Sequence, residues 1–113
     1  MALTTAQSFN HVAIYVSDMR TSADWYIETL GMQEASASDN HIFLRLADGT
    51  VLALFEASDQ TRVGSGVHHL ALNLPPGEKD AALEHLRERG VELSRRGPSP
   101  SFQDPDGYWI HFS

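Results

Sequence analysis

The feature of this sequence that most constrains its fold is an internal repeat with an offset of 58 residues. The segment His11–Ile14 returns as His69–Leu72, and the turn Asp48-Gly49 returns as Asp106-Gly107 at the same offset. Separate features that share one offset indicate a duplication. Each half is too short to bury its helix-packing face well, so the repeat predicts two half-length units that pair around one central space.

Hydrophobic periodicity within each half predicts strands and one helix. The expected strands are Asn10–Val16, Ile42–Leu46, Val51–Phe55, His69–Leu74 and Tyr108–Ser113, with a short one at Phe102 and Gln103. The expected helices are Ser22–Leu30 and Lys79–Arg89, each followed by a glycine suited to a C-cap, Gly31 and Gly90. We expect loops at Asp59–Gly66 and Arg95–Pro100. The prediction is an α+β fold of two paired βαβββ modules: one domain over residues 1–113, with repeats 9–57 and 67–113 joined by a loop 58–66.

Composition excludes several classes of site and partner. The chain has no cysteine, which excludes a disulfide framework, a thiolate zinc site, an iron–sulfur cluster and a cysteine nucleophile. With 15 acidic and 8 basic side chains the net charge is −7, which disfavours nucleic acid as a partner. The longest apolar run, Val51–Phe55, is far shorter than the roughly 20 residues of a membrane span. Met1–Phe9 has no apolar signal-peptide core, so we expect a cytoplasmic protein without a membrane partner.

Three of the six histidines occupy matched positions on predicted strands. His11, His69 and His111 each alternate with aliphatic neighbours, so their side chains leave the sheet on the face opposite the helices. Three converging imidazoles are a ligand set for a divalent metal with open positions. The alternative for any single strand histidine is an ordinary hydrogen-bonded or surface role. The repeat maps position 111 onto Ala53, which cannot bind a metal, so one quadrant of the predicted site lacks a ligand.

Other side chains on the same predicted face suit a small organic ligand. By strand alternation this group comprises Tyr15, Phe43, Arg45, Asn73 and Trp109. The aromatic members would supply a wall for the ligand, and Arg45 could clamp an anionic group. The alternatives are core packing for the aromatic residues and a plain exposed cation for Arg45. His41 shares this face and is a further candidate for contact with the substrate or with a metal ligand, but its place at a strand start favours a surface role.

Three segments carry a family resemblance that spans nearly the whole chain: FNHVAIYVSDMRTSADWYIETLGM, HHLALNL and FQDPDGYWIHF. In order and spacing they resemble the vicinal oxygen chelate superfamily, which includes glyoxalases, bleomycin-resistance proteins and extradiol dioxygenases. The resemblance implies paired βαβββ modules that form a cupped, mostly antiparallel mixed sheet around a divalent metal such as Fe(II), Mn, Zn or Ni. It also implies a homodimer.

The resemblance assigns roles to individual positions. His11 and His69 match histidine ligands of the family, whereas His111 stands where catalytic members usually carry a glutamate. Ala53 stands where glyoxalase I places another glutamate. Glyoxalase chemistry abstracts a proton next to a carbonyl and needs a carboxylate base near the metal, which neither position provides.

Two functions from different classes therefore remain. The first is a metal-dependent enzyme that binds a small substrate through vicinal oxygens, with dioxygenase-type chemistry preferred to glyoxalase I isomerisation. It is favoured by the three histidines. The second is a metal-free protein that sequesters a small molecule, as bleomycin-binding members do. It is favoured by the absence of both carboxylates.

Overall fold

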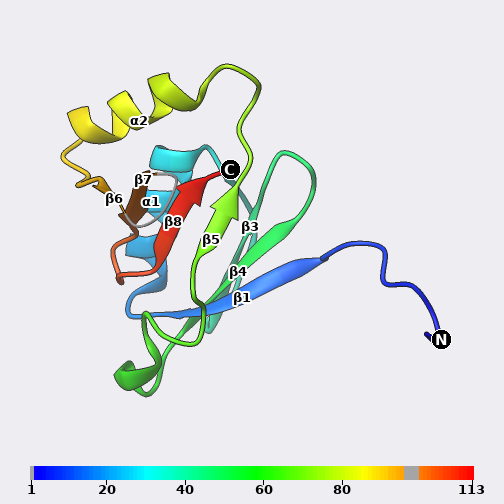
Figure 1. The fold of residues 1–113 in the computed structure, drawn as a ribbon. Helices are drawn as coiled ribbons and strands as arrows, with labels where there is room; N and C mark the ends of the chain where they lie inside the picture. Colours follow the sequence, from blue (N-terminus) through cyan, green and yellow to red (C-terminus); the bar gives the residue numbers. More distant parts are fainter. Residues whose placement is uncertain (1, 96–99) are drawn as a thin grey trace.

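Two four-stranded sheets, one from each half of the chain, make up the fold (Figure 1). The computed structural model describes residues 2–95 and 100–113. The first module contains β1 (His11–Val16), α1 (Met19–Leu30), β2 (Gln33–Ala37), β3 (His41–Arg45) and β4 (Val51–Glu56). The second contains β5 (Leu70–Leu72), α2 (Lys79–Glu88), β6 (Ser94–Arg95), β7 (Pro100–Gln103) and β8 (Trp109–Phe112). A 3₁₀ turn, η1 (Gln60–Arg62), lies between them. The predicted α+β fold of two βαβββ modules is confirmed.

The two sheets have the same topology. Their strand orders are β1-β4-β3-β2 and β5-β8-β7-β6. In each sheet the first strand of the module pairs in parallel with the last, and the other pairs are antiparallel. Ala13 pairs with Ala53 in the first sheet, and Ala71 pairs with His111 in the second. Ala53 and His111 are therefore equivalent in structure as well as in sequence offset.

Local capping explains the bounds of α1. The Asp18 carboxylate accepts a hydrogen bond from the Thr21 backbone N–H at 2.9 Å, which starts the helix at Met19, three residues before the predicted start. At the other end Gly31 takes a left-handed conformation with φ 71° and donates its N–H to the Ile27 carbonyl. The predicted glycine C-cap is therefore confirmed at this helix.

Two edge strands were not predicted. β2 is polar and mostly exposed, with a register shift between Glu34 and Ser36, and β6 has only two residues. Neither has the apolar alternation that marks a strand in sequence, because an edge strand with little core contact does not need it.

Residues 96–99 of the predicted Arg95–Pro100 turn region lie outside the described residues. In the predicted loop Asp59–Gly66 the Asp59 carboxylate accepts from the Thr61 N–H and caps η1.

Helix α1 packs against the aliphatic faces of both sheets. Its buried Tyr26 belongs to one core with Leu44 and Leu54 of the first sheet and Phe102 and Ile110 of the second. By contrast α2 buries only Leu86 and lies along the outer edge of the molecule (Figure 1). No helix in residues 2–95 and 100–113 is long and apolar enough to span a membrane.

A turn at residues 104–108 fastens the second module to the first. The Asp104 carboxylate, only 5% exposed, accepts hydrogen bonds from the Tyr26 hydroxyl at 2.6 Å and from its own turn's Asp106 and Tyr108 N–H groups at 2.9 Å. The Tyr108 hydroxyl donates to the Tyr15 carbonyl at 2.6 Å. The Tyr26–Asp104 and Tyr108–Tyr15 bonds join residues 78 and 93 positions apart in the chain, so the turn holds the modules together.

The neighbouring Asp106 strengthens the same junction. Its carboxylate accepts from the backbone N–H and hydroxyl of Ser17 and from the hydroxyl of Ser22, all in the first module. Gly64 of the connecting loop passes so close that a Cβ there would lie 2.6 Å from the Asp106 carbonyl oxygen. With φ at +76°, Gly64 also adopts a conformation that other residues rarely take.

Removing the Tyr26 hydroxyl tests this junction. We expect Tyr26→Phe to lower the free energy of unfolding by about 1–3 kcal/mol, because a buried Asp104 oxygen loses its partner. Denaturant unfolding of both proteins at pH 7 measures the loss. Tyr15→Phe is the matched control, since Tyr15 is 42% exposed and its hydroxyl takes no part in the junction. An equal loss in both variants would contradict this role of Tyr26.

The stability of the wild type and of Tyr26→Phe should also depend differently on pH. Burial already raises the pKa of Asp104 above its ordinary value, so the native state binds a proton more tightly than the unfolded chain. Its contribution to stability is then lost as the pH rises through the native pKa. Tyr26→Phe removes a hydrogen bond that lowers this pKa, so the pKa rises further. The stability lost in the variant should therefore grow from acidic to neutral pH, and a loss that shrinks would contradict the assignment.

Candidate functional site

The first sheet presents a face to solvent that carries several of the predicted site residues. Along β1 the side chains of His11, Ala13 and Tyr15 are exposed, whereas Ile14 and Val16 are buried against α1, as the alternation predicts. The register continues this face over β4 and β3, where Tyr15, Phe55 and His41 form one row, Ala13, Ala53 and Phe43 the next, and His11, Val51 and Arg45 the third. We call it the open face of the first sheet.

The second sheet brings two of the predicted ligands together. The rings of His69, just before β5, and His111, on β8, have centroids 4.9 Å apart. His68 joins them through its Nδ1, 2.9 Å from the Nδ1 of His69. The Nδ1 of His111 is buried and has no hydrogen-bond partner. An unpaired buried nitrogen is costly, so this atom calls for a ligand or a partner that the chain itself does not provide.

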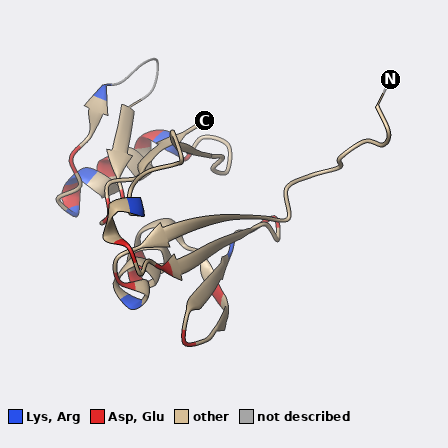
Figure 2. Cartoon of the chain, turned by 90° about the horizontal axis from the view of Figure 1, so that it is seen from below, with Lys and Arg blue, Asp and Glu red and all other residues tan. Residues whose placement is uncertain are grey.

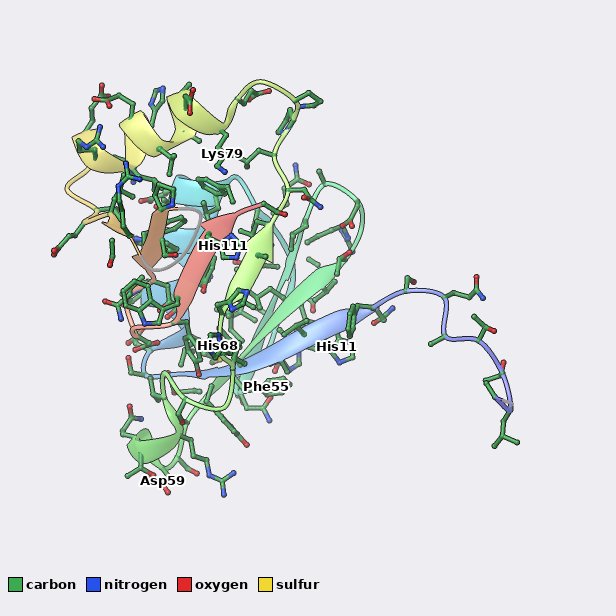
Figure 3. All side chains as sticks on the ribbon, viewed as in Figure 1. His11, Phe55, Asp59, His68, Lys79 and His111 are labelled. Atoms are coloured by element: carbon green, nitrogen blue, oxygen red, sulfur yellow. The ribbon has the colours of Figure 1, made fainter. Side chains whose placement is uncertain are left out.

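The third predicted ligand lies elsewhere in the same chain. His11 is on β1, close to where the N-terminal arm leaves the sheet, and Figure 3 shows it well apart from His111. Its Nδ1 lies 2.8 Å from the Asn10 side-chain oxygen. A proton donated to that oxygen leaves the lone pair of Nε2 free. Within the described parts of one chain, no three histidine or acidic side chains are close enough to hold a metal ion.

The predicted substrate residues divide between the two sheets. Tyr15, Phe43 and Arg45 share the open face of the first sheet, and Trp109 lies on β8, two residues before His111. Asn73 follows β5 and lines a groove of about 730 Å³ between the first sheet and β5, whose walls are mostly aliphatic and include no histidine. Position 53, in the middle of its row, is an alanine and is fully buried. The first sheet therefore has no carboxylate at the position equivalent to His111.

Sequence reasoning missed Phe55 and Arg62 and gave more weight to a surface role for His41. Phe55 lies between Tyr15 and His41 in the register, and alternation from Ala53 was a signal that could have placed it there. His41, predicted to have a surface role, stacks on Phe43 with centroids 4.3 Å apart. Arg62 of η1 lies over the Tyr15 ring, with its Cζ 5.8 Å from the centroid. No pattern in the sequence marked Arg62, because its position depends on how the connecting loop folds back.

The charges on this face differ from those elsewhere on the molecule. Figure 2 shows acidic residues mainly on helices and turns, and the strands of the first sheet almost free of charge. Arg20, Arg87 and Arg89 each form ion pairs with carboxylates. In the part of the chain that the structure describes, Arg45 and Arg62 form none. An acidic protein thus leaves two guanidinium groups unpaired beside the open face.

Comparison with known proteins identifies the family. Residues 8–112 match the family model described as the glyoxalase/bleomycin resistance protein/dioxygenase superfamily. An uncharacterised protein of Bacillus subtilis, YwkD, is 32% identical over 118 aligned residues that cover 88% of this chain and 91% of YwkD. Lactoylglutathione lyase of Escherichia coli O157:H7 is 28% identical, with 88% of this chain and 87% of that protein covered.

Solved structures agree on the fold. A glyoxalase/dioxygenase from Nostoc punctiforme superposes with a TM-score of 0.79 at 24% identity and covers 99% of this chain and 93% of its own. A glutamate-to-glutamine mutant of the fosfomycin resistance protein FosX from Listeria monocytogenes, solved with Mn(II) and 1S,2S-dihydroxypropylphosphonic acid, gives a TM-score of 0.77 at 20% identity, with 96% of this chain and 90% of that chain covered. The paired βαβββ modules and the match along nearly the whole sequence lead to one conclusion: the chain belongs to the glyoxalase/bleomycin resistance protein/dioxygenase superfamily.

Proposed function

We propose that this protein is a metal-dependent enzyme that binds a small substrate through vicinal oxygens at a site shared by two subunits. The observation that carries the proposal is the His69–His111 pair, in which the buried His111 Nδ1 has no partner. Two adjacent imidazoles with an unpaired nitrogen fit a divalent metal, since neutral imidazole is a common ligand of Zn, Mn, Fe and Ni.

The third ligand in this proposal is His11 of a second subunit. Within one chain both sheets use their aliphatic faces to cover α1, so the faces that carry His11 and the His69–His111 pair are directed away from that shared core. In a symmetric dimer every contact of one subunit is repeated by its partner, so a dimer that sets the first sheet of one subunit against the second sheet of the other would form this contact twice. Each site would then combine His11 of one subunit with His69 and His111 of the other.

The residues of the site set limits on its chemistry. Three neutral histidines leave the full +2 charge of the metal in place, and a metal there would act as a Lewis acid toward a chelating substrate and, as iron(II), would support oxygen activation. Arg45, on the same face as His11, would bind an anionic group of that substrate. Ala53 and His111 provide no carboxylate base, so proton abstraction of the glyoxalase I kind is disfavoured and dioxygenase-type chemistry is preferred.

The relatives support the metal without fixing the reaction. FosX, which shares the fold, was solved with Mn(II), and lactoylglutathione lyase is an enzyme of similar length. The second candidate function is a metal-free binding protein. The observation in its favour is the group of uncharged aromatic side chains on the open face, which suits capture of a ligand without a reaction.

Metal analysis of protein purified without a histidine tag tests the proposal. We expect the wild type to hold one metal per subunit after incubation with iron(II), manganese, zinc or nickel. His69→Ala should lower metal affinity by more than about 100-fold, because loss of even an outer partner of a ligand costs 10–100-fold. His85→Ala on the exposed side of α2 is the matched control. Wild-type protein that takes up none of the four metals would favour the metal-free function instead.

Co-expression of two variants that each lose metal tests whether the metal site is shared between two subunits. We expect His11→Ala and His69→Ala dimers each to lose metal, whereas co-expression of the two yields mixed dimers with one intact site. With random pairing about a quarter of all sites should then regain metal. The readout is metal content of the purified dimers. If mixed dimers form, as shown by mass spectrometry, and no site recovers metal, then each site belongs to a single chain.

A further inference from the structure

We propose that the open face of the first sheet binds a planar aromatic acid, with Arg62 as the residue that recognises its carboxylate. This inference rests on the proposed function, because it names the substrate class of the same site. It assigns a ligand-binding role to the loop 58–66, which also joins the two modules. The aromatic rings, the position of Arg62 and the distribution of charge support it in turn.

The first support is a cluster of rings on the neighbouring strands β3 and β4, next to Tyr15 of β1 in the register. His41 and Phe43 stack with centroids 4.3 Å apart and planes at 28°. Phe55 lies 6.0 Å from His41 and 6.2 Å from Phe43, and in the register it stands between His41 and Tyr15. The Ser38 hydroxyl lies 2.8 Å from His41 Nδ1 and helps to fix that ring. The planes of these rings lie at 28° to 65° to one another, so they present both faces and edges against which a further aromatic ring can pack.

The second support is the position of Arg62. Its guanidinium lies over the Tyr15 ring, 5.8 Å from the centroid, within the range of a cation–π contact. The planar fork of a guanidinium binds a carboxylate through two parallel hydrogen bonds, and the contact with Tyr15 holds this fork beside the open face. The loop geometry is defined: Asp59 caps η1, and the Ser65 hydroxyl donates to the Arg62 carbonyl at 3.1 Å.

The third support is that Arg62 has no ion-pair partner among the residues that the structure describes. The chain has 15 carboxylate side chains against 8 basic ones, yet in residues 2–95 and 100–113 none of them pairs with Arg62. Tyr15, which holds it, is 42% exposed and is one of the large apolar side chains left open to solvent. An unpaired cation next to exposed rings matches a ligand that has both a ring and a negative charge.

Binding of three small probes tests this inference. Benzoate has a planar ring and a carboxylate, cyclohexanecarboxylate keeps the charge without the planar ring, and benzamide keeps the ring without the charge. We expect wild-type protein to bind benzoate at least about fivefold more tightly than either of the others, measured by NMR titration. Arg62→Gln should weaken benzoate binding about tenfold and leave benzamide unchanged, because only the charge-assisted contact is lost.

Two further variants complete the test. Phe43→Leu should reduce the preference for benzoate over cyclohexanecarboxylate and keep the preference over benzamide. Arg95→Gln, on the edge strand β6 of the other sheet, is the matched control and should change none of the three affinities. Equal affinity for all probes, binding of none of them, or the same loss in both arginine variants would overturn the proposal.

The titrations are made with and without added Mn(II), so that the two proposals can fail separately. If the preference for benzoate and its dependence on Arg62 appear in protein that takes up no metal, then the aromatic acid site stands and the metal-dependent enzyme does not. If metal binds to the histidines but no probe depends on Arg62, then the metal site stands and this substrate class is wrong.

Discussion

The buried hydrogen bond between the Tyr26 hydroxyl and the Asp104 carboxylate is the contact on which the arrangement of the two modules depends. It joins α1 to the turn before β8, and the same carboxylate fixes that turn through two backbone N–H groups. Burial and the neighbouring carboxylate raise the pKa of the Tyr26 hydroxyl, so it stays a proton donor at physiological pH. Because His111 is seven residues beyond Asp104 along the chain, the junction also sets where β8 carries this histidine.

The sequence was sufficient to predict the two repeated modules and the buried and exposed faces of their main strands. The 58-residue offset predicted two βαβββ modules, and the alternation of His11 and Tyr15 with Ile14 and Val16 predicted which face of β1 stays open. It missed β2, whose polar side chains lie at a sheet edge and carry no apolar period. Periodicity reports burial, so it finds elements that pack against a core and overlooks those that do not.

The candidate site was harder to predict, because its members come from contacts between distant segments. His69 and His111 lie side by side, as matched strand positions suggested, but His11 does not join them within the chain. Which faces of two modules meet depends on how each sheet covers α1, and no short motif encodes that choice. Arg62 was missed for a similar reason, since a loop residue over Tyr15 follows from the fold of the loop and not from its composition.

The two modules have the same topology, but they do not bury their cores independently, because α1 is shared by both sheets. The N-terminal half retains its own helix when considered alone, whereas the C-terminal half would expose Phe102, Ile110 and Phe112, with α2 burying little more than Leu86. The two helices therefore differ in what they must pack against: α1 is covered by both sheets, whereas α2 contributes the buried Leu86 and the partly buried Ala82 and Leu83 to the core. Sequence change in this chain should accumulate in α2 and be resisted in α1, so the age of the repeat is better judged from its strands than from its helices.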